Sequence, residues 1–513
     1  MTAGQSPHRW SSPWPRLAAA YEQERDDGRA VWILLALFVM IWTAFQIIAF
    51  ASVCLHDDML EVFAWSRHPS AGYGKHPPLA PLLAAAWFAV FPIANWSFEL
   101  LASVNAAVAL FAVDLIARRY VAPDRRLLVL LLLLLTPFYQ FHGERFTPNA
   151  VLLSTWPLAT YCFLRAFTSR RVGWSLLAGA TAALAMLGKY YSIYLIAGFV
   201  ASALYHPRRG EYLRSPSPWL SILAGLVVLA PHLDWLMTMG PAPFRYALAG
   251  HTPSSLADEL KKTLLYAAGG LAYVVLSIVA YLFAVRPDRR LLAATLWPDD
   301  PDRRMLVVLL AAPLLLPMLT APIIGVILTP LWTMSGWFLL PIILLAPAQL
   351  GLPRATTMRV ALAVAIVTAA VLVAAPVVAW HNFTAEAENG RVCCRVASEE
   401  LTRAWHAATG RPLTLVAGDS SLAQGATFYS ADHPDSAPDA AWETPPWITD
   451  ARRSRDGFAN TCFASDRACS AAAEQNTAGR LGVVRVEKDV TASFFGIASA
   501  SAKVVFTMVP PQQ

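Results

Sequence analysis

Long apolar runs recur along the first three quarters of the chain and then stop. The longest contain about the 20 residues that an α-helix needs to cross the hydrocarbon core of a bilayer. The apolar stretch 77–91 is shorter, and we expect it to lie along the membrane surface. The pattern predicts eleven spans: 31–53, 97–117, 127–142, 149–167, 173–188, 191–205, 217–237, 263–285, 304–326, 330–348 and 357–380.

Positive charge is distributed unevenly between the short segments that join these spans. The segments on one side carry 21 arginines, and those on the other side carry 7 lysines and arginines. Because cytoplasmic loops are enriched in positive charge, this bias predicts a cytoplasmic N-terminus and an external C-terminus. If 77–91 also crossed, the arginine-rich segment 118–126 would face the wrong side.

Composition supports the membrane interpretation. The 513 residues are 56% hydrophobic and 14% charged, whereas soluble domains carry about 25% charged residues. The net charge of +6 lies in short loops and indicates topology rather than nucleic-acid binding. The run 31–53 is too long for the apolar part of a signal peptide, so we expect an uncleaved anchor.

Three regions follow from this pattern. We expect a cytoplasmic segment at 1–30, a transmembrane domain at 31–380 whose first external loop is 54–96, and an extracytoplasmic C-terminal domain at 381–513. The tail is predicted to be a small α/β domain. Helical spacing covers 401–409, and strand-like apolar runs occupy 413–417 and 481–486. Residues 238–262 are expected to form a long external loop.

Four of the six cysteines fall in this tail, while Cys54 and Cys162 lie in or at the membrane. Cysteines in an extracytoplasmic domain favour disulfides. A bridge between the adjacent Cys393 and Cys394 would be strained. We therefore expect at least one disulfide in the tail, with this pair bonded to Cys462 and Cys469.

Three carboxylates follow the first span within five residues: Asp57, Asp58 and Glu61. At a helix exit they lie at the boundary between lipid and water, where one of them would serve as a general base on a hydroxyl or amine. Two together would be able to hold a divalent cation. The spacing fits equally well the N-cap and first turn of a short surface helix.

Cationic side chains on the same external face are candidates for binding an anion. Lys75 and His76 precede Pro77-Pro78, and proline fits the first turn of a helix, whose amino end favours anions. Lys189 and Tyr190 lie in the short link between two spans. This arrangement suits a lipid phosphate, although lysine and tyrosine at such an edge are also ordinary membrane anchors.

Other polar residues on this face are weaker candidates for substrate or metal binding. Glu144 and Arg145 are expected to pair with each other. His232 ends a span two residues before Asp234, so these two would be able to ligate a metal.

Residues 58–66, 72–73 and 77–79 resemble the first-loop pattern of bacterial polytopic glycosyltransferases with the C-type fold (GT-C). These are the dolichyl-phosphate-mannose protein mannosyltransferase-like enzymes, which include rhizobial galacturonosyltransferases and the lipid A aminoarabinose transferase. Residues 146–149, 188–190 and 231–235 look like further family motifs. The similarity covers roughly 31–350 and does not include the tail.

The resemblance implies a polyprenyl-phosphate sugar donor, an extracytoplasmic active site and a catalytic aspartate in the first loop. Alignment on Glu61 and Trp65-Ser66 places this aspartate at Asp58, with Asp57 as the alternative. Lys75 stands where the aminoarabinose transferase has a metal-binding acid. The resemblance therefore leaves open whether this protein uses a divalent cation as a cofactor.

The expected protein is an α-helical polytopic glycosyltransferase of the bacterial inner membrane. It would transfer a sugar to lipid A, lipopolysaccharide core, another envelope glycan or lipid, or a protein. Lys75, His76 and Lys189, with Tyr190, would bind the donor phosphate. The alternative is a transporter or flippase of lipid-linked sugars, which would place charges at mid-bilayer. Asp114, near a predicted cytoplasmic helix end, argues against that alternative.

Overall fold

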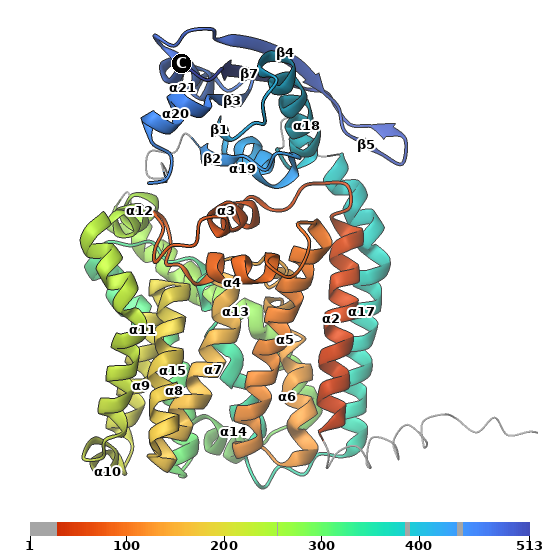
Figure 1. The fold of residues 1–513 in the computed structure, drawn as a ribbon. Coiled ribbons are helices and arrows are strands. Elements are labelled where there is room, and N and C mark those ends of the chain that lie inside the picture. Colours follow the sequence, from red (N-terminus) through yellow and green to blue (C-terminus); the bar gives the residue numbers. More distant parts are fainter. Residues whose placement is uncertain (1–27, 254, 385–389, 439–444, 513) are drawn as a thin grey trace, which may run out of the picture.

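The computed structural model describes residues 28–253, 255–384, 390–438 and 445–512. A bundle of long helices carries a small α/β domain on one end, and two short helices lie across the bundle axis between them (Figure 1). The long helices of the bundle are α2 Arg29–Ala49, α5 Asn95–Tyr120, α7 Pro148–Ser169, α8 Val172–Gly188, α9 Ile193–Tyr205, α11 Ser217–Met239, α13 Leu256–Val285, α15 Pro301–Ile324 and α17 Arg354–Phe383.

Seven helices in the described part of the chain are long and apolar enough to cross a membrane: α2, α5, α7, α11, α13, α15 and α17. Helix α11 is the most exposed of these seven helices: only 6% of its most apolar window is buried inside the protein, compared with 83% for α7. Apolar side chains that are not covered by protein need a lipid environment. The chain is therefore an integral membrane protein.

Each predicted span coincides with helical structure, but two of them are broken. Span 127–142 consists of α6 Arg126–Leu133 and a π-turn, η2 Phe138–His142, separated by Pro137. Span 330–348 consists of short pieces, η4 Pro330–Thr333, η5 Trp337–Leu339 and α16 Leu340–Leu345. Proline lacks the amide that would continue a helix, which explains the first break. The predicted number of eleven crossings depends on these two segments and on the shorter apolar helices α8 and α9.

The two helices across the bundle axis are α3 Asp57–Ser66 and α4 Leu79–Phe88 (Figure 1). Pro78 forms the N-cap of α4, and the helix lies across the others, as predicted for the stretch 77–91. The expected long loop at 238–262 is wrong. This segment contains α12 Ala242–His251 and the start of α13, whose N-cap Ser255 accepts a hydrogen bond from the Asp258 amide.

The end of the bundle opposite the α/β domain is held by ion pairs and short helices. Asp114 is fully buried, and its carboxylate contacts Arg118 at 2.8 Å and Arg126 at 2.7 Å. Arg125 donates to the carbonyl oxygens of Leu345 and Pro347. The short helices at this end are η1 Pro123–Arg125, α10 Arg209–Leu213 and α14 Arg289–Leu296.

The C-terminal domain is built around a five-stranded sheet with strand order β2-β1-β3-β7-β4. Strand β1 is parallel to β2 and β3, while β7 is antiparallel to β3 and β4. This agrees with the predicted α/β tail. Its elements are α18 Gly390–Thr409, β1 Leu415–Gly418, α19 Ser420–Tyr429, β2 Asp435–Pro438, α20 Asp450–Asp456, β3 Phe458–Phe463, α21 Arg467–Thr477, β4 Val484–Val490, β5 Ser493–Phe494, β6 Ile497–Ala498 and β7 Ala502–Val509.

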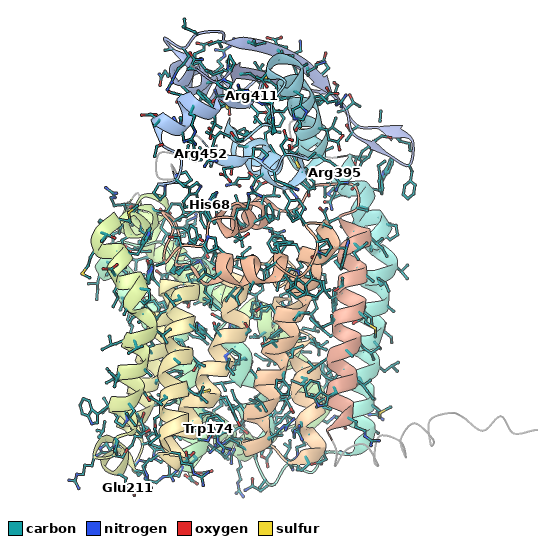
Figure 2. The ribbon with its side chains drawn as sticks, in the orientation of Figure 1. His68, Trp174, Glu211, Arg395, Arg411 and Arg452 are labelled. Carbon is teal, nitrogen blue, oxygen red and sulfur yellow. A yellow bond between two sulfur atoms is a disulfide. The ribbon has the colours of Figure 1, made fainter. Side chains whose placement is uncertain are left out.

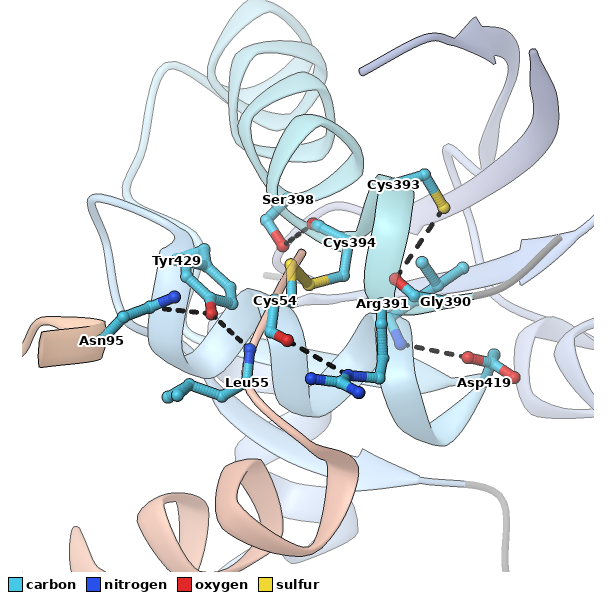
Figure 3. Close-up of a disulfide and its surroundings, with 11 residues drawn as sticks. Cys54, Leu55, Asn95, Gly390, Arg391, Cys393, Cys394, Ser398, Asp419 and Tyr429 are labelled. Carbon is cyan, nitrogen blue, oxygen red and sulfur yellow. Dashed lines mark hydrogen bonds between the residues drawn. A yellow bond between two sulfur atoms is a disulfide. The ribbon is translucent and has the colours of Figure 1, made fainter. Parts of the chain in front are cut away.

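The expected cysteine pairing is wrong in detail, although the tail does contain a disulfide. Cys462 bonds to Cys469 within the domain, whereas Cys394 bonds to Cys54 of the first loop, 340 residues away (Figure 3). Cys393 forms no disulfide, and its thiol contacts the Gly390 carbonyl oxygen. Cys54 lies 340 residues from its partner, and the residues around it in the sequence give no indication of the pairing.

The first loop and the C-terminal domain are joined by further contacts. Phe63 of α3 packs edge-on against Phe428 of α19, with ring centroids 4.8 Å apart. His68 lies across the junction from Arg452 (Figure 2), and the Asp435 carboxylate contacts each of them at 2.8 Å. Burial alone would raise the pKa of Asp435, but hydrogen bonds from His68 and Arg452, with their charges, lower it to about 2. The domain is thus docked on α3.

Candidate active site

A cavity of about 480 Å³ lies between α3, α9, α12 and α15 at the domain-facing end of the bundle. Ligand sites typically have volumes of about 300–1,000 Å³. The cavity gathers six of the predicted site residues: Asp58, Glu61, Lys75, His76, Lys189 and Tyr190. Four others do not line it: Asp57, Glu144, Arg145 and His232.

Asp58 stands in the first turn of α3, and its side chain is 52% exposed. The N-cap of this helix is His56, whose Nδ1 lies 3.2 Å from the Asp58 amide nitrogen. The N-cap of the helix is therefore His56 rather than an aspartate, and Asp57 and Asp58 form its first turn. Asp58 also lines the cavity, and its role as a base stays a prediction.

Lys75 and Glu61 form an ion pair on the cavity wall, with 2.8 Å between Nζ and Oε1. Glu61 is buried, with 4% of its surface exposed, and Lys75 also lies over the ring of Tyr246 at 5.2 Å. A buried carboxylate needs such a partner. The pair fixes the ammonium group of Lys75 beside the cavity. His76 lies edge-on to Tyr246, with ring centroids 5.7 Å apart.

Lys189 enters the cavity from the link between α8 and η3 Tyr190–Ser192. Its Nζ donates to Asn149 Oδ1 at 2.7 Å and lies 4.7 Å from the centre of the Trp332 ring. Both partners are neutral. Burial lowers the pKa of Lys189 to about 8, although the charge of Asp58 opposes this shift. An anion bound in the cavity would neutralise the positive charge of the Lys189 ammonium group.

Tyr190 is held in place from the side away from the cavity. His232 Nδ1 donates to the Ala71 carbonyl oxygen at 2.7 Å, which leaves Nε2 to accept from the Tyr190 hydroxyl at 2.8 Å. A Cβ atom at Gly72 would lie 2.4 Å from the Trp235 ring, so this approach requires glycine. His232 therefore positions Tyr190 and the first loop.

On the other side of α3 lies a separate polar cluster. Arg145 contacts His56 Nε2 at 3.0 Å and the Glu144 carboxylate at 3.8 Å, so the predicted pairing of Glu144 with Arg145 is confirmed. Burial raises the pKa of Glu144 to about 7, against the charges of Arg145 and Arg391. Burial, followed by the charge of Arg145, lowers the pKa of His56. Asp57 belongs to this side, where its Oδ1 is buried without a hydrogen-bond partner among the described residues.

The donor set of the cavity does not fit a divalent cation held by the protein. Glu61 is already bound to Lys75. In the part of the chain that the structure describes, no three His, Cys, Asp or Glu side chains gather as metal ligands. Ca²⁺ takes six to eight oxygen ligands, and even Mg²⁺, which keeps several waters, is held by one or two free carboxylates together with substrate phosphates.

Several wall residues had no recognisable pattern in the sequence. Trp332 belongs to the broken span, and Phe244 and Tyr246 belong to a segment that was expected to be a loop. His56 directly precedes the acidic pair, and this proximity was the one available indication of its position. In the sequence, an aromatic residue within an apolar run cannot be distinguished from an ordinary core residue. Only the three-dimensional structure shows that it lines a cavity.

Comparisons with known proteins support the family resemblance from residue 75 onward. Residues 75–235 match the family model described as dolichyl-phosphate-mannose-protein mannosyltransferase. A comparison with curated protein sequences gives no match.

Two solved structures have a similar fold. The crystal structure of ArnT from Cupriavidus metallidurans bound to undecaprenyl phosphate has a TM-score of 0.59 and 13% identity, covering 93% of this chain and 98% of that chain. Its apo structure gives a TM-score of 0.57 and 12% identity with the same coverage. The likeness thus extends into the tail. Residues 75–235 are thus similar to the dolichyl-phosphate-mannose-protein mannosyltransferase family, and the chain as a whole has a fold similar to that of ArnT.

Proposed function

We propose that the chain transfers a sugar from a polyprenyl phosphate to an acceptor on the external side of the bacterial inner membrane. One observation carries this proposal: a single cavity combines the Asp58 carboxylate and the ammonium groups of Lys75 and Lys189 with an apolar wall. The apolar wall includes Ile193 and Ile324. A polyprenyl phosphate has the matching parts, an anionic headgroup and an apolar chain. The similar fold of ArnT, solved with undecaprenyl phosphate, supports this class of donor.

The reaction is a single displacement at the anomeric carbon. The acceptor oxygen or nitrogen forms the new bond while the bond from carbon to the phosphate oxygen breaks, and the acceptor proton moves to Asp58. Lys189, Lys75 and His76 stabilise the negative charge that develops on the departing lipid phosphate. Tyr190, held by His232, orients the phosphate. Helix α12 covers the cavity and limits the competing reaction with water.

A transporter of lipid-linked sugars is the alternative, and one contact argues against it. Asp114 is a fully buried acid inside a predicted span, and its charge is neutralised by Arg118 and Arg126. These ion pairs hold the helix ends opposite the α/β domain together. The Asp114 carboxylate is therefore not available to line a transport pathway. Charged residues of transport pathways face a cavity or the bundle interior at mid-bilayer.

Purified protein in lipid vesicles with a labelled polyprenyl-phosphate sugar separates the two functions. A transferase moves the label to a new molecule and releases polyprenyl phosphate, whereas a flippase changes only the leaflet of the intact donor. Finding only intact donor in the opposite leaflet would replace the proposal by the alternative.

The orientation has its own test at two exposed positions at opposite ends of the protein (Figure 2). In intact cells a membrane-impermeant maleimide is expected to label Arg411→Cys and not Glu211→Cys. The opposite result would invert the topology.

A further inference from the structure

The strands β5 and β6 form a hairpin that projects from the C-terminal domain beside the domain-facing end of α17 (Figure 1). Ser493 pairs with Ala498 and Phe494 pairs with Ile497, so the connecting loop contains only residues 495–496. The two strands form a sheet of their own, separate from the five-stranded sheet. The tip of the hairpin therefore lies outside the core of the domain.

The tip carries a phenylalanine in a backbone conformation that phenylalanine rarely adopts. Phe495 has a φ of 49° and Gly496 has a φ of 79°, as expected for the two central residues of a type I′ turn. Asn-Gly is a favoured pair for this turn, because asparagine tolerates the left-handed region and a bulky side chain does not. Residues held in such sparsely populated conformations cluster at functional sites. The turn itself thus gives no reason for a phenylalanine at this position.

The Phe495 side chain is also unusually exposed. Its surface is 90% exposed, and that of Ile497 on the adjacent strand is 50% exposed. Among the spans, Ile323 and Val373 are 82% and 79% exposed, which is suitable only where lipid covers them. Neighbouring apolar side chains that protein leaves uncovered are typical of a contact with a partner or a membrane.

Helix α2 fixes the level of the membrane boundary on the domain side. Its 21 residues extend over about 31 Å, close to the roughly 30 Å of the hydrocarbon core. The Asn382 side chain donates to the carbonyl oxygen of Ala49, the last residue of α2, at 3.2 Å. The Ser52 hydroxyl donates to the Ala379 carbonyl oxygen at 2.7 Å. This part of α17 therefore lies at the boundary between lipid and water.

A continuous row of aromatic rings connects this boundary with the hairpin. Trp380 is 44% exposed, and tryptophan is enriched at membrane boundaries. Its ring centroid lies 6.0 Å from that of Phe383, and the Phe383 ring lies 5.6 Å from that of Phe494 in β5. Phe494 in turn lies 4.5 Å from Phe495. These are distances of packed aromatic pairs, so the hairpin stands next to the boundary, with Phe495 as the outermost ring.

We infer that the β5–β6 hairpin inserts its tip into the phospholipid headgroup region on the domain side of the membrane, where Phe495 and Ile497 contact lipid. Apolar burial in this region offsets the backbone strain at Phe495. The bilayer is favoured over a protein partner, because the hairpin continues the row of rings that begins at the end of α17. The contact supports the C-terminal domain independently of the Cys54–Cys394 bond and of the reaction that the protein performs.

Fluorescence quenching tests the contact with lipid. The environment-sensitive fluorophore NBD is attached to Phe495→Cys in vesicles of phosphatidylethanolamine and phosphatidylglycerol that contain phosphatidylcholine spin-labelled near the headgroup. The matched control is Leu481→Cys, since Leu481 is 77% exposed and its carbonyl oxygen is bonded to Gln512 near the C-terminus, on the far side of the domain (Figure 1). Wild-type protein treated in the same way corrects for labelling of native thiols.

The label at position 495 is expected to be quenched roughly threefold more strongly than the label at position 481, because interfacial segments lie within the headgroup region. Equal quenching at both positions would overturn the inference. An unquenched, blue-shifted emission at position 495 that increases with protein density would assign the tip to a second copy of the chain instead.

A substitution at the tip distinguishes a membrane contact from a merely structural turn. Phe495→Asn gives the turn its favoured Asn-Gly sequence and removes the apolar side chain. In lipid nanodiscs this variant is expected to exchange the backbone amide hydrogens of residues 490–500 about tenfold faster than the wild type, because local opening becomes easier when the lipid contact is lost. Leu481→Asn is the control and should leave this exchange unchanged. Unchanged or slower exchange in Phe495→Asn would overturn the inference, and neither measurement depends on the proposed transfer reaction.

Discussion

The first external loop has two very different sides. Toward the bundle, Asp58 and Lys75 border a cavity large enough for a ligand. Toward the C-terminal domain, the same loop is bonded covalently through Cys54 to Cys394, and the Leu55 amide donates to the Tyr429 hydroxyl at 2.8 Å (Figure 3). The side toward the bundle has charged groups that line a cavity, whereas the side toward the C-terminal domain is bonded to other parts of the protein.

This difference explains what the C-terminal domain does for the site. In the proposed mechanism, the Asp58 carboxylate must be held within about 0.5 Å of its working position by elements that do not move. Helix α3 has only ten residues, and isolated helices of this length are marginal in water. Docking on α19 and the bond to α18 supply the missing support. Changes on the cavity side are expected to affect kinetics, and changes on the domain side stability.

The largest effect is expected for Asp58→Asn. This substitution keeps the size of the side chain but removes the base, and loss of a general base typically lowers the rate by about 10²–10⁴-fold. The variant is expected to bind undecaprenyl phosphate and to unfold as the wild type does. Transfer of a labelled sugar in vesicles measures the loss. Asp57→Asn, on the other side of α3, is the matched control. Near-normal turnover by Asp58→Asn together with a large loss in Asp57→Asn would assign the role of general base to Asp57 instead.

The next effect is on stability and comes from the long-range disulfide. Replacing both Cys54 and Cys394 by serine is expected to lower the stability of the docked domain by about 2–5 kcal/mol. The matched control replaces Cys462 and Cys469, which are only seven residues apart. A disulfide that closes a shorter loop contributes less stability, so this control variant is expected to lose only about 2 kcal/mol. Thermal unfolding in detergent compares the two variants. A larger loss in the control would contradict the anchoring role of the long-range bond.

The sequence predicted what depends on local pattern. Apolar run length gave the spans, and the proline pair at 77–78 gave α4. The tail periodicity gave α18, β1 and β4. Contacts between distant segments were missed, as the Cys54–Cys394 bond shows: a cysteine next to a membrane span carries no local indication of a partner in the tail. Helix α12 was missed because its short amphipathic pattern between Gly240 and Ser254 resembles a polar loop.

For the candidate site, too, the residues could be predicted from the sequence, whereas their side-chain contacts could not. Charged residues in an apolar chain are conspicuous, so the acidic cluster, Lys75 and Lys189 could be selected from the sequence, whereas the choice of Asp58 over Asp57 came from the family resemblance. Their convergence on one cavity followed from topology, which placed them on one face. The pairing of Lys75 with Glu61 and the contact of Lys189 with Trp332 depend on side-chain packing. No spacing in the sequence specifies such contacts.

A smaller effect, with a defined pH dependence, is expected at Lys189. Its pKa of about 8 means that the ammonium loses its proton as the pH rises through 8, so affinity for undecaprenyl phosphate is expected to fall above that pH, by up to about tenfold per unit. Lys189→Ala should bind about tenfold more weakly at pH 7. Lys189→Arg stays charged and should show no such fall, which equilibrium binding between pH 6.5 and 9.5 would measure. A wild-type affinity that stays constant across this range would exclude Lys189 as the phosphate partner.

The smallest effect tests a single hydrogen bond on the domain side. The Tyr429 hydroxyl accepts from the Leu55 amide and donates to Asn95, so Tyr429→Phe leaves both without this partner. One such bond contributes about 1 kcal/mol, which corresponds to roughly fivefold faster hydrogen exchange of the Leu55 amide. Tyr205→Phe is the control, because Tyr205 is 47% exposed at the other end of the bundle. Mass spectrometry of the peptide that contains residues 54–60 reports the exchange. Unchanged exchange in Tyr429→Phe would mean that the disulfide alone fixes the start of α3, and the two sides of the loop would then differ by one covalent bond rather than by a network.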